Sequence, residues 1–411
     1  MRVLILSQYF PPELTAGAAR IHFFSRHLAG VGHDVHVICE IPNHPRGIVE
    51  EGYGGRAFDR RRLDGVDVDY VWVPTSSVKT ARSRVVAYGT YALMAAVAGV
   101  RAPRPDVVFA SSPPLPVGAA ARAVALRHRV PWVFDVRDLW PAAAEAVGEL
   151  RAAKLIEAAT KLEHSLYRSA AAITTPSGGA RAQIVRSGVP DRKVHLVASG
   201  TTPEWLELGE RVVERAPLGL PDDEFVWTYA GNIGLAQDVG AAVRAAAELG
   251  PGYRLVVVGD GPLRSELETL AVRLASGRVR FTGLVPRMTA AHYMRASDAL
   301  LVSLARAPGL EYAVPSKLYD CCATGRAVIV AGEGEVRRLS DRHGIALTVT
   351  PGDAGSLAAA VRRLAEDAAL RDRLTSNARQ FAREHLREHQ AHRLVELLLS
   401  VAERSRRGRR S

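Results

Sequence analysis

Residues 225–238 read FVWTYAGNIGLAQD. The segment begins with apolar and β-branched residues typical of a buried strand, and then turns sharply at Gly231 and Gly234. A helix is expected from about Asp238 to Leu249, with Asp238 as its N-cap. This order of strand, glycine turn and helix is the repeating unit of a parallel sheet covered by helices.

The same alternation continues on both sides of this segment. Toward the C-terminus, the pattern predicts strands at 253–259, 279–284, 298–304, 327–332 and 345–349, and helices at 263–275 and 316–323. Toward the N-terminus, it predicts a helix at 18–32 and strands at 3–6, 34–39, 69–73, 106–110, 131–136, 171–176 and 193–198. The fold class is therefore α/β, with parallel sheets wound on both faces.

A stretch of turn and charged residues at 199–224 interrupts the alternation, so two domains are expected in the 411 residues. The predicted division is an N-terminal domain at 1–200, a linker at 201–222 and a C-terminal domain at 223–385. Residues 386–411 are expected to form a helix that packs back on the N-terminal domain, followed by a basic tail. Ligands of such sheets bind at the carboxyl ends of the strands, which predicts a site in the cleft between the domains.

The net charge of +11 is unevenly distributed, because residues 1–200 carry 25 Lys and Arg against 17 Asp and Glu. This balance suits an anionic ligand or an acidic membrane surface. Nucleic acid is not expected as a partner, since the sequence has neither a zinc finger nor a basic helix interleaved with aromatic residues. Without a signal peptide, and with Cys39, Cys321 and Cys322 in apolar segments, the chain is expected to be cytoplasmic with reduced core thiols.

The longest uncharged run, VVAYGTYALMAAVAGV at 85–100, has two interpretations. At 16 residues it is shorter than the roughly 20 that span a bilayer, so it predicts a buried helix. Alternatively, flanking arginines such as Arg84 and Arg101 would suit a helix lying in the interface at the inner face of the cytoplasmic membrane.

Three loops of the C-terminal domain follow successive strands and should meet at one edge of the sheet. They are AGNIGLAQD at 230–238, VGDGP at 258–262 with Gly259 and Gly261, and VPSKLYD at 314–320. Backbone amides at such turns bind anionic oxygens. The third loop adds Lys317, one of only five lysines in the chain, and Asp320 one helical turn later. A positive charge that neutralises a diphosphate and a carboxylate that accepts from ribose hydroxyls predict a nucleotide carrying a diphosphate.

Other nucleotide and metal sites do not fit the sequence. The first predicted strand is followed by SQYFPPELTAGAA instead of G-x-G-x-x-G, and no P-loop motif is present. The paired carboxylates of DVD at 67–69 lie in an alternating strand with the acids facing outward, so no metal is expected.

The order of these and further motifs resembles that of a known family over nearly the whole chain. The motifs are YFPPE…GAAR, ASSPP, FDVRDLWP, GNIGLAQD, GDGP, FTGLV and PSKLYD…GRAVI. Together they resemble retaining glycosyltransferases of family 4, which have the GT-B fold of two Rossmann-like domains. Within the family, the chain is similar to the branch of sugar transferases of polysaccharide assembly that includes the L-fucosamine transferases.

The resemblance assigns the donor site residue by residue. Asn232 and Gln237 stand where many members have an Arg and a Lys on the diphosphate, which shifts charge neutralisation onto Lys317. Asp320 takes the place of the carboxylate that binds ribose, and Glu311 lies one residue from the place of the carboxylate that contacts the donor sugar. The remaining donor contacts implied by the resemblance are Gly17, Gly231, Gly259, Gly261, Leu284, Val285, Pro315, Ser316 and Leu318.

In the N-terminal domain, Arg137 stands where many relatives have a His, and Asp138 follows it. The resemblance implies that Arg137 steadies the departing phosphate or positions the sugar, and that Asp138 holds the acceptor or serves as base. An alternative is a purely structural set of ion pairs among Asp135, Arg137 and Asp138. Gly17 and Ala18 resemble the glycine-rich loop that closes over donor and acceptor, with Ala18 in place of a frequent glycine.

The expected function is transfer of a sugar, an N-acetylhexosamine or a related one, from a UDP-sugar to a hydroxyl acceptor, with retention and without a metal or other cofactor. The acceptor would be a lipid-linked saccharide or a small natural product. Two alternatives stay open: a UDP-N-acetylhexosamine 2-epimerase, which shares the architecture, and a non-catalytic scaffold, which the displaced Glu311 and the missing His would explain.

Overall fold

The computed structural model describes all residues except 14, 45, 79, 147–149, 151 and 408–411. The chain divides into two compact units: Met1–Ala198 together with the chain from Glu388 onward, and Ser199–Arg387. The segment 201–222, expected as a linker, belongs to the second unit, where Trp205 and Leu208 are buried. Of the expected basic tail, residues 408–411 lie outside the described residues.

The first unit is built on an eight-stranded sheet with the order β3-β4-β2-β1-β5-β6-β7-β8. All neighbouring strands are parallel except β3 and β4. The strands are β1 (Arg2–Ser7), β2 (Asp34–Glu40), β3 (Phe58–Leu63), β4 (Val66–Val71), β5 (Val107–Ser112), β6 (Trp132–Val136), β7 (Ala172–Thr175) and β8 (Val194–Leu196). The helices are α1 (Ala16–Gly30), α2 (Ala81–Arg101), α3 (Pro116–His128), α4 (Ala142–Ala146), α5 (Ala153–Ser169), α6 (Gly178–Arg186), the 3₁₀ turn η1 (Asp191–Lys193) and α15 (Arg387–Arg407), which starts at the boundary between the units.

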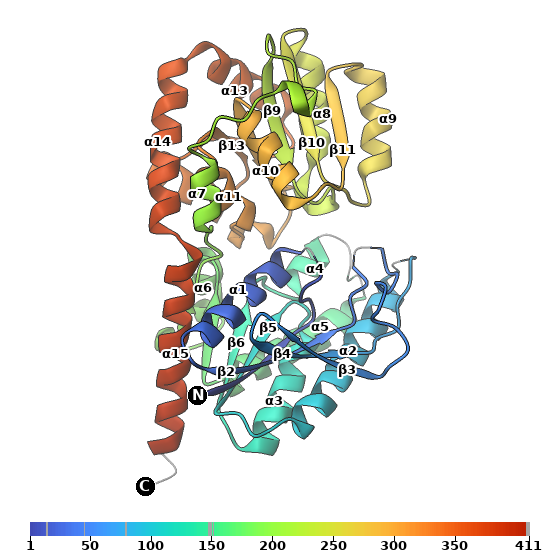
Figure 1. Cartoon of the computed structure of the whole chain (residues 1–411), viewed down its shortest axis with the longest axis vertical. Coiled ribbons are helices and arrows are strands. Elements are labelled where there is room, and N and C mark those ends of the chain that lie inside the picture. Colours follow the sequence, from blue (N-terminus) through green and yellow to red (C-terminus); the bar gives the residue numbers. More distant parts are fainter. Residues whose placement is uncertain (14, 45, 79, 147–149, 151, 408–411) are drawn as a thin grey trace. The chain divides into compact units, whose positions relative to one another are not determined.

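The second unit is built on a six-stranded, fully parallel sheet with the order β11-β10-β9-β12-β13-β14. The strands are β9 (Phe225–Ala230), β10 (Tyr253–Val258), β11 (Val279–Gly283), β12 (Ala299–Ser303), β13 (Ala327–Ala331) and β14 (Leu347–Val349). The helices are α7 (Pro203–Leu208), α8 (Val239–Leu249), α9 (Arg264–Leu274), α10 (Arg287–Ala296), α11 (Ser316–Ala323), α12 (Glu335–His343), α13 (Ala354–Glu366) and α14 (Ala368–Glu384), with 3₁₀ turns η2 (Ala216–Leu218), η3 (Leu235–Gln237) and η4 (Leu310–Tyr312). Figure 1 shows α8 and α9 beside β10 and β11 in this unit.

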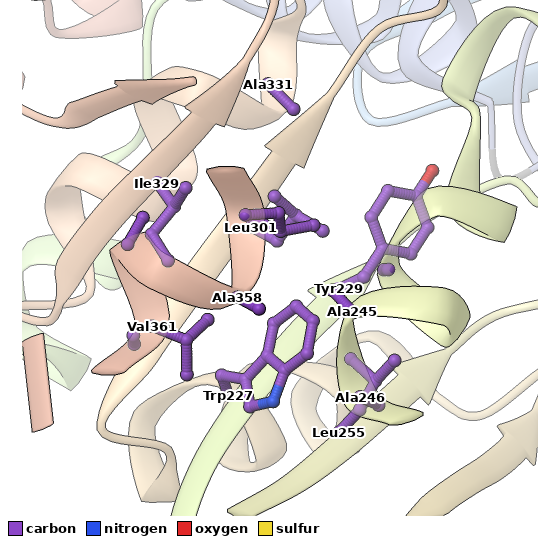
Figure 2. Close-up of a cluster of buried hydrophobic side chains, with 14 of the residues drawn as sticks. Trp227, Tyr229, Ala245, Ala246, Leu255, Leu301, Ile329, Ala331, Ala358 and Val361 are labelled. Atoms are coloured by element: carbon purple, nitrogen blue, oxygen red, sulfur yellow. The ribbon is translucent and has the colours of Figure 1, made fainter. Parts of the chain in front are cut away.

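Alternate residues of the central strands enter two different cores, which is why these strands are apolar throughout. Trp227 and Tyr229 of β9 pack with α8 and α13 on one face, in the cluster drawn in Figure 2. Val226, the residue before Trp227, packs with Tyr293 and Ala296 of α10 on the other face. A strand buried on both sides must be hydrophobic at every position, as parallel strands between helices are.

Each sheet reverses its strand order at one point. In the first unit the chain passes from β1 to β2 on one side and later to β5 on the other, and in the second unit β9 has β10 and β12 as its neighbours. Loops that leave the carboxyl ends of strands at such a reversal form the usual ligand site of open α/β sheets. In the second unit, these are the loops after β9 and β12.

The structure corrects three local predictions. The strand β3, FDRRRL, has no hydrophobic pattern and was not expected. Asp69 of β4 does not face outward: it is buried and pairs with His36 at 2.9 Å and with Arg60 at 2.7 Å. Asp238 precedes α8 in a left-handed conformation, with φ of 43°, and makes no side-chain cap hydrogen bond.

The uncharged run at 85–100 forms most of α2, but this helix is not simply buried. Tyr91 and Ala95 face the core, whereas Val86 and Leu93 are 50% and 65% exposed. Within the described residues, Arg82–Arg101 is the one helix long and apolar enough to cross a membrane, by length and composition alone.

Candidate active site

The glycine turns of the second unit pack backbone against backbone. Gly231 follows β9 with φ of 140°, and its amide donates to the carbonyl of Val258 at 2.8 Å. A Cβ on Gly259 would collide with the carbonyl oxygen of Gly231, and one on Gly261 would lie 2.6 Å from the nitrogen of Ile233. The loops after β9 and β10 therefore meet, as predicted, but Gly259 and Gly261 serve first to let them touch.

Lys317 brings the third loop to the same place. Its ammonium nitrogen lies 2.6 Å from the position that a Cβ on Gly231 would take. The same nitrogen donates to the Tyr229 hydroxyl at 2.7 Å and lies 3.9 Å from the centre of the Tyr229 ring. Burial lowers the pKa of Lys317 to about 8, since a desolvated ammonium loses the hydration that favours its charge.

The loop that carries Lys317 ends in the first turn of α11. Pro315 precedes this helix, and Ser316 and Lys317 begin it, so their amides have no acceptor within the helix. Such amides and the helix dipole favour a negative charge beside Lys317. Leu318 differs from its assignment as a donor contact, because its side chain is fully buried and its amide donates to the Pro315 carbonyl at 3.0 Å.

The two neutral residues expected on the diphosphate lie together at the turn after β9. The side-chain amide of Asn232 donates to the Gln237 side-chain oxygen at 3.3 Å. Gly234 lies against both, since a Cβ there would be 2.7 Å from Asn232 Nδ2 and 2.9 Å from Gln237 Oε1. The pair supplies hydrogen-bonding groups but no charge, which leaves Lys317 as the cation at this turn.

Asp320 and Glu311, the two expected carboxylates, have different surroundings. Asp320 accepts a hydrogen bond from the Thr201 hydroxyl at 2.9 Å. Burial raises the pKa of Asp320, and Arg387 and Thr201 oppose that rise. Glu311 lies in η4, and its buried Oε2 has no hydrogen-bond partner among the described residues. A buried carboxylate oxygen left in this state is a candidate acceptor for a hydroxyl group of a ligand.

Leu284 and Val285, which follow β11, differ in burial. Leu284 is 56% exposed, whereas Val285 is half-buried against the core that α10 covers. Their assignment as donor contacts rests on the resemblance alone.

The candidate residues of the first unit lie at the carboxyl ends of its strands. The Arg137 guanidinium donates to the carbonyls of Ser112 at 3.3 Å and Pro113 at 3.2 Å. Gly17, in the first turn of α1, gives it room, because a Cβ there would collide with the guanidinium. Ala18, beside it, is fully buried, and its amide donates to the Thr15 hydroxyl at 3.0 Å.

The alternative of ion pairs among the strand-end residues is wrong for Asp135. Its carboxylate pairs with Arg20 at 3.2 Å and accepts from Ser111 and Thr174, all inside the unit. Asp138 is exposed. Burial lowers the pKa of Arg137, and the carboxylates of Asp138 and Asp135 oppose that effect.

Sequence reasoning missed two residues of this site, Tyr229 and Thr201. Tyr229 reads as an ordinary core aromatic of β9, and Thr201 as part of a linker. No local pattern indicates that either contacts a residue of α11, since those partners lie 88 and 119 positions away.

Comparisons with known proteins place the chain in a family. A model described as "Glycosyl transferase 4-like domain" matches residues 15–200, and "Glycosyl transferases group 1" matches residues 210–381. A putative colanic acid biosynthesis glycosyl transferase of Escherichia coli K12, WcaI, is 24% identical over 88% of this chain and 92% of its own length. Alpha-D-kanosaminyltransferase of Streptomyces kanamyceticus is 29% identical over 53% of this chain and 56% of its own length.

Among solved structures, HepE of Anabaena in complex with UDP has a similar fold. It matches with a TM-score of 0.72 and 16% identity, over 97% of this chain and 100% of its own. Two Rossmann-like units, each with a parallel sheet and strand-end loops that carry the polar residues, define the GT-B class of glycosyltransferases. With both family models matched in succession, the chain belongs to the glycosyltransferases of family 4 and is a sugar-transferring enzyme.

Proposed function

We propose that this glycosyltransferase moves a sugar from a UDP-sugar to a hydroxyl acceptor, with retention of configuration at the anomeric carbon. The sugar would be an N-acetylhexosamine or a related one. The observation that carries the proposal is the place of Lys317, a partly buried ammonium held between the Gly231 turn and the first turn of α11. The complex of HepE with UDP supports the choice of base.

In the proposed reaction, the bond between the anomeric carbon and the β-phosphate oxygen breaks as the acceptor oxygen attacks from the same face. The acceptor proton passes to the departing phosphate, so no protein nucleophile is needed. Lys317 and the amides at the start of α11 stabilise the negative charge that develops on the leaving diphosphate. These groups would supply what a divalent metal supplies elsewhere, so we expect full turnover in the presence of EDTA.

The other candidate residues would orient the two substrates. Asp320 would accept from ribose hydroxyls, and the unpaired oxygen of Glu311 from a hydroxyl of the donor sugar. In the first unit, Arg137 would steady the departing phosphate or position the sugar, and Asp138 would hold the acceptor. The names of the relatives support two acceptor classes, cell-surface polysaccharide intermediates and natural-product glycosides.

The test is to incubate the protein with UDP-sugars and GDP-sugars and with acceptors of both classes, and to measure nucleotide release. NMR of the product would then give the anomeric configuration. Lys317→Gln should abolish turnover, while Lys161→Gln, an exposed lysine of α5, should not. Conversion of a UDP-N-acetylhexosamine without acceptor would favour the 2-epimerase instead, and UDP binding without transfer to any acceptor would favour the scaffold.

We further infer that the enzyme works at the inner face of the cytoplasmic membrane, through α2. Val85, Val86 and Leu93 of this helix are exposed, and exposed Arg82 and Arg101 flank them. Apolar side chains bordered by arginines suit the boundary between acyl chains and anionic headgroups.

Co-sedimentation with vesicles tests this inference. Binding to vesicles with anionic lipid should exceed binding to neutral ones. Val86→Glu should weaken it several-fold, whereas Val272→Glu, on the exposed side of α9, should not. Equal binding of both variants would rule out α2 as the contact.

A further inference from the structure

Tyr229 occupies a position that core packing alone does not explain. Its ring belongs to the core cluster around Trp227 and is fully buried. In Figure 2, however, the hydroxyl points away from the apolar side chains of that cluster. A phenylalanine would fill the same space without a polar atom, so the hydroxyl calls for a role of its own.

The hydroxyl joins two parts of the donor loops. It donates to the carbonyl oxygen of Asn232 at 2.6 Å, and it accepts from the Lys317 ammonium at 2.7 Å. The ring face lies under the same ammonium, at 3.9 Å from nitrogen to centroid. Tyr229 thus contacts both the turn after β9 and the ammonium group of Lys317, a residue in the first turn of α11.

The ammonium has no anionic partner in the described part of the chain, where no carboxylate lies within 4 Å of it. Burial raises the pKa of Cys321 on α11 to about 12 and also raises the pKa of Tyr229, so both of these neighbours are neutral near pH 7. A lysine side chain has a flexible four-carbon stem, so an isolated ammonium needs neutral contacts to hold one position.

We propose that Tyr229 is a positioning residue for the transfer reaction, whose hydroxyl and ring hold the Lys317 ammonium at the Gly231 turn, where the donor diphosphate binds. This inference rests on the proposed function of Lys317 and adds the residue through which that function depends on the core of the domain. The hydroxyl and the ring face also favour the charged form of the lysine, because both interact better with an ammonium than with an amine.

Binding of UDP, measured by calorimetry, tests the proposal. Tyr229→Phe removes only the hydroxyl and should weaken UDP binding about tenfold, the ratio expected for one hydrogen bond to a charged group. Tyr253→Phe, the same change at the far end of the neighbouring strand β10, should leave the affinity unchanged. In a Lys317→Gln background, Tyr229→Phe should have no further effect, because a positioning residue acts only through its target.

A second measurement does not depend on the donor. With only five lysines in the chain, ¹⁵N or ¹³C NMR can follow each amino group, and the signal lost in Lys317→Gln identifies Lys317. Tyr229→Phe should move the Lys317 titration to lower pH, while Tyr253→Phe leaves it in place.

The two measurements separate the possible failures. An unchanged Lys317 titration together with unchanged UDP affinity in a folded Tyr229→Phe protein would overturn the positioning role. If Tyr229→Phe lowered UDP affinity equally in the wild-type protein and in Lys317→Gln, the role would also be overturned, since Tyr229 would then act through the fold alone. A shifted titration in a protein that binds no UDP would keep the pairing of Tyr229 with Lys317 and reject the proposed donor.

Discussion

Lys317 has a pKa of about 8, well below the ordinary value for lysine, because burial removes most of its hydration. The charged form is present below that pH and is lost as the pH rises through it. A bound diphosphate would restore the charge, so donor binding above pH 8 must include the uptake of a proton.

We therefore expect the affinity for UDP to be nearly constant between pH 7 and 8 and to fall about tenfold per unit above pH 8. The UDP phosphate itself titrates near pH 6 and does not contribute in this range. Calorimetry in buffers of different ionisation enthalpy would show the proton uptake directly. In Lys317→Gln, the weaker binding that remains should not vary with pH over this range, and a persisting pH dependence would exclude Lys317 as its source.

Gly17 is a second residue that decides the position of a neighbouring side chain, because its lack of a Cβ leaves room for the Arg137 guanidinium. Gly17→Ala should displace the Arg137 guanidinium and lower kcat/KM at least tenfold, because a misplaced polar group loses its contribution to orientation. The free energy of unfolding should hardly change, because alanine favours the helix by about 0.5–1 kcal/mol and this gain offsets the cost of moving the guanidinium.

Gly30→Ala at the last turn of the same helix is the matched control, because a Cβ there meets nothing within 4 Å. Activity assays and thermal melting of both variants would separate the effects. If Gly17→Ala kept full activity, Arg137 would not need its observed position.

At the scale of elements, the loops after β9 and β10 hold each other in position. The loops after β9 and β10 are joined by backbone hydrogen bonds from Ile233 to Asp260 and from Leu263 to Ile233. Gly261 lies where these bonds cross, with the backbone of Ile233 in contact. A disturbance in either loop should therefore reach the turn that faces Lys317.

Gly261→Ala should separate these loops, cost about 1–3 kcal/mol of unfolding free energy and weaken UDP binding at least tenfold. Gly54→Ala is the control, since a Cβ at that loop glycine meets nothing within 4 Å. Denaturant unfolding and UDP titration would measure both quantities. An unchanged UDP affinity in a destabilised Gly261→Ala protein would separate the loop packing from the donor site.

The helices and strands around this site were predicted with bounds within one or two residues, because strands buried on both faces and glycine turns have strong local signals. The pairs that complete the site were not predicted. Tyr229 with Lys317, Thr201 with Asp320 and Gly17 with Arg137 each join residues far apart in sequence. Periodicity reports which face of an element is buried, but not which residue of another element lies opposite.

At the scale of the whole molecule, each unit has its own sheet and its own hydrophobic core. Domains of this size can unfold separately, in which case one melting temperature does not describe the chain.

Calorimetry should therefore resolve two transitions. UDP at a hundredfold excess over its Kd should stabilise only one of them, by about 2.7 kcal/mol, because Lys317, Asp320 and the Gly231 turn, which are proposed to bind UDP, all lie in the second unit. Lys317→Gln should remove this selective shift and leave both transitions in place. A single transition that UDP raises as a whole would show that the two units unfold together.

The unexpected strand β3 has a consequence for behaviour at high concentration. It forms one border of the larger sheet, where unpaired backbone groups could recruit a strand from another copy. Three consecutive arginines, Arg60 to Arg62, occupy that border, and two of them are largely exposed. Each of the three pairs with a carboxylate, and a strand added from another molecule would have to remove water from these charged groups. That cost would keep sheets of neighbouring molecules from joining edge to edge, which makes a segment without any hydrophobic pattern a safeguard against aggregation.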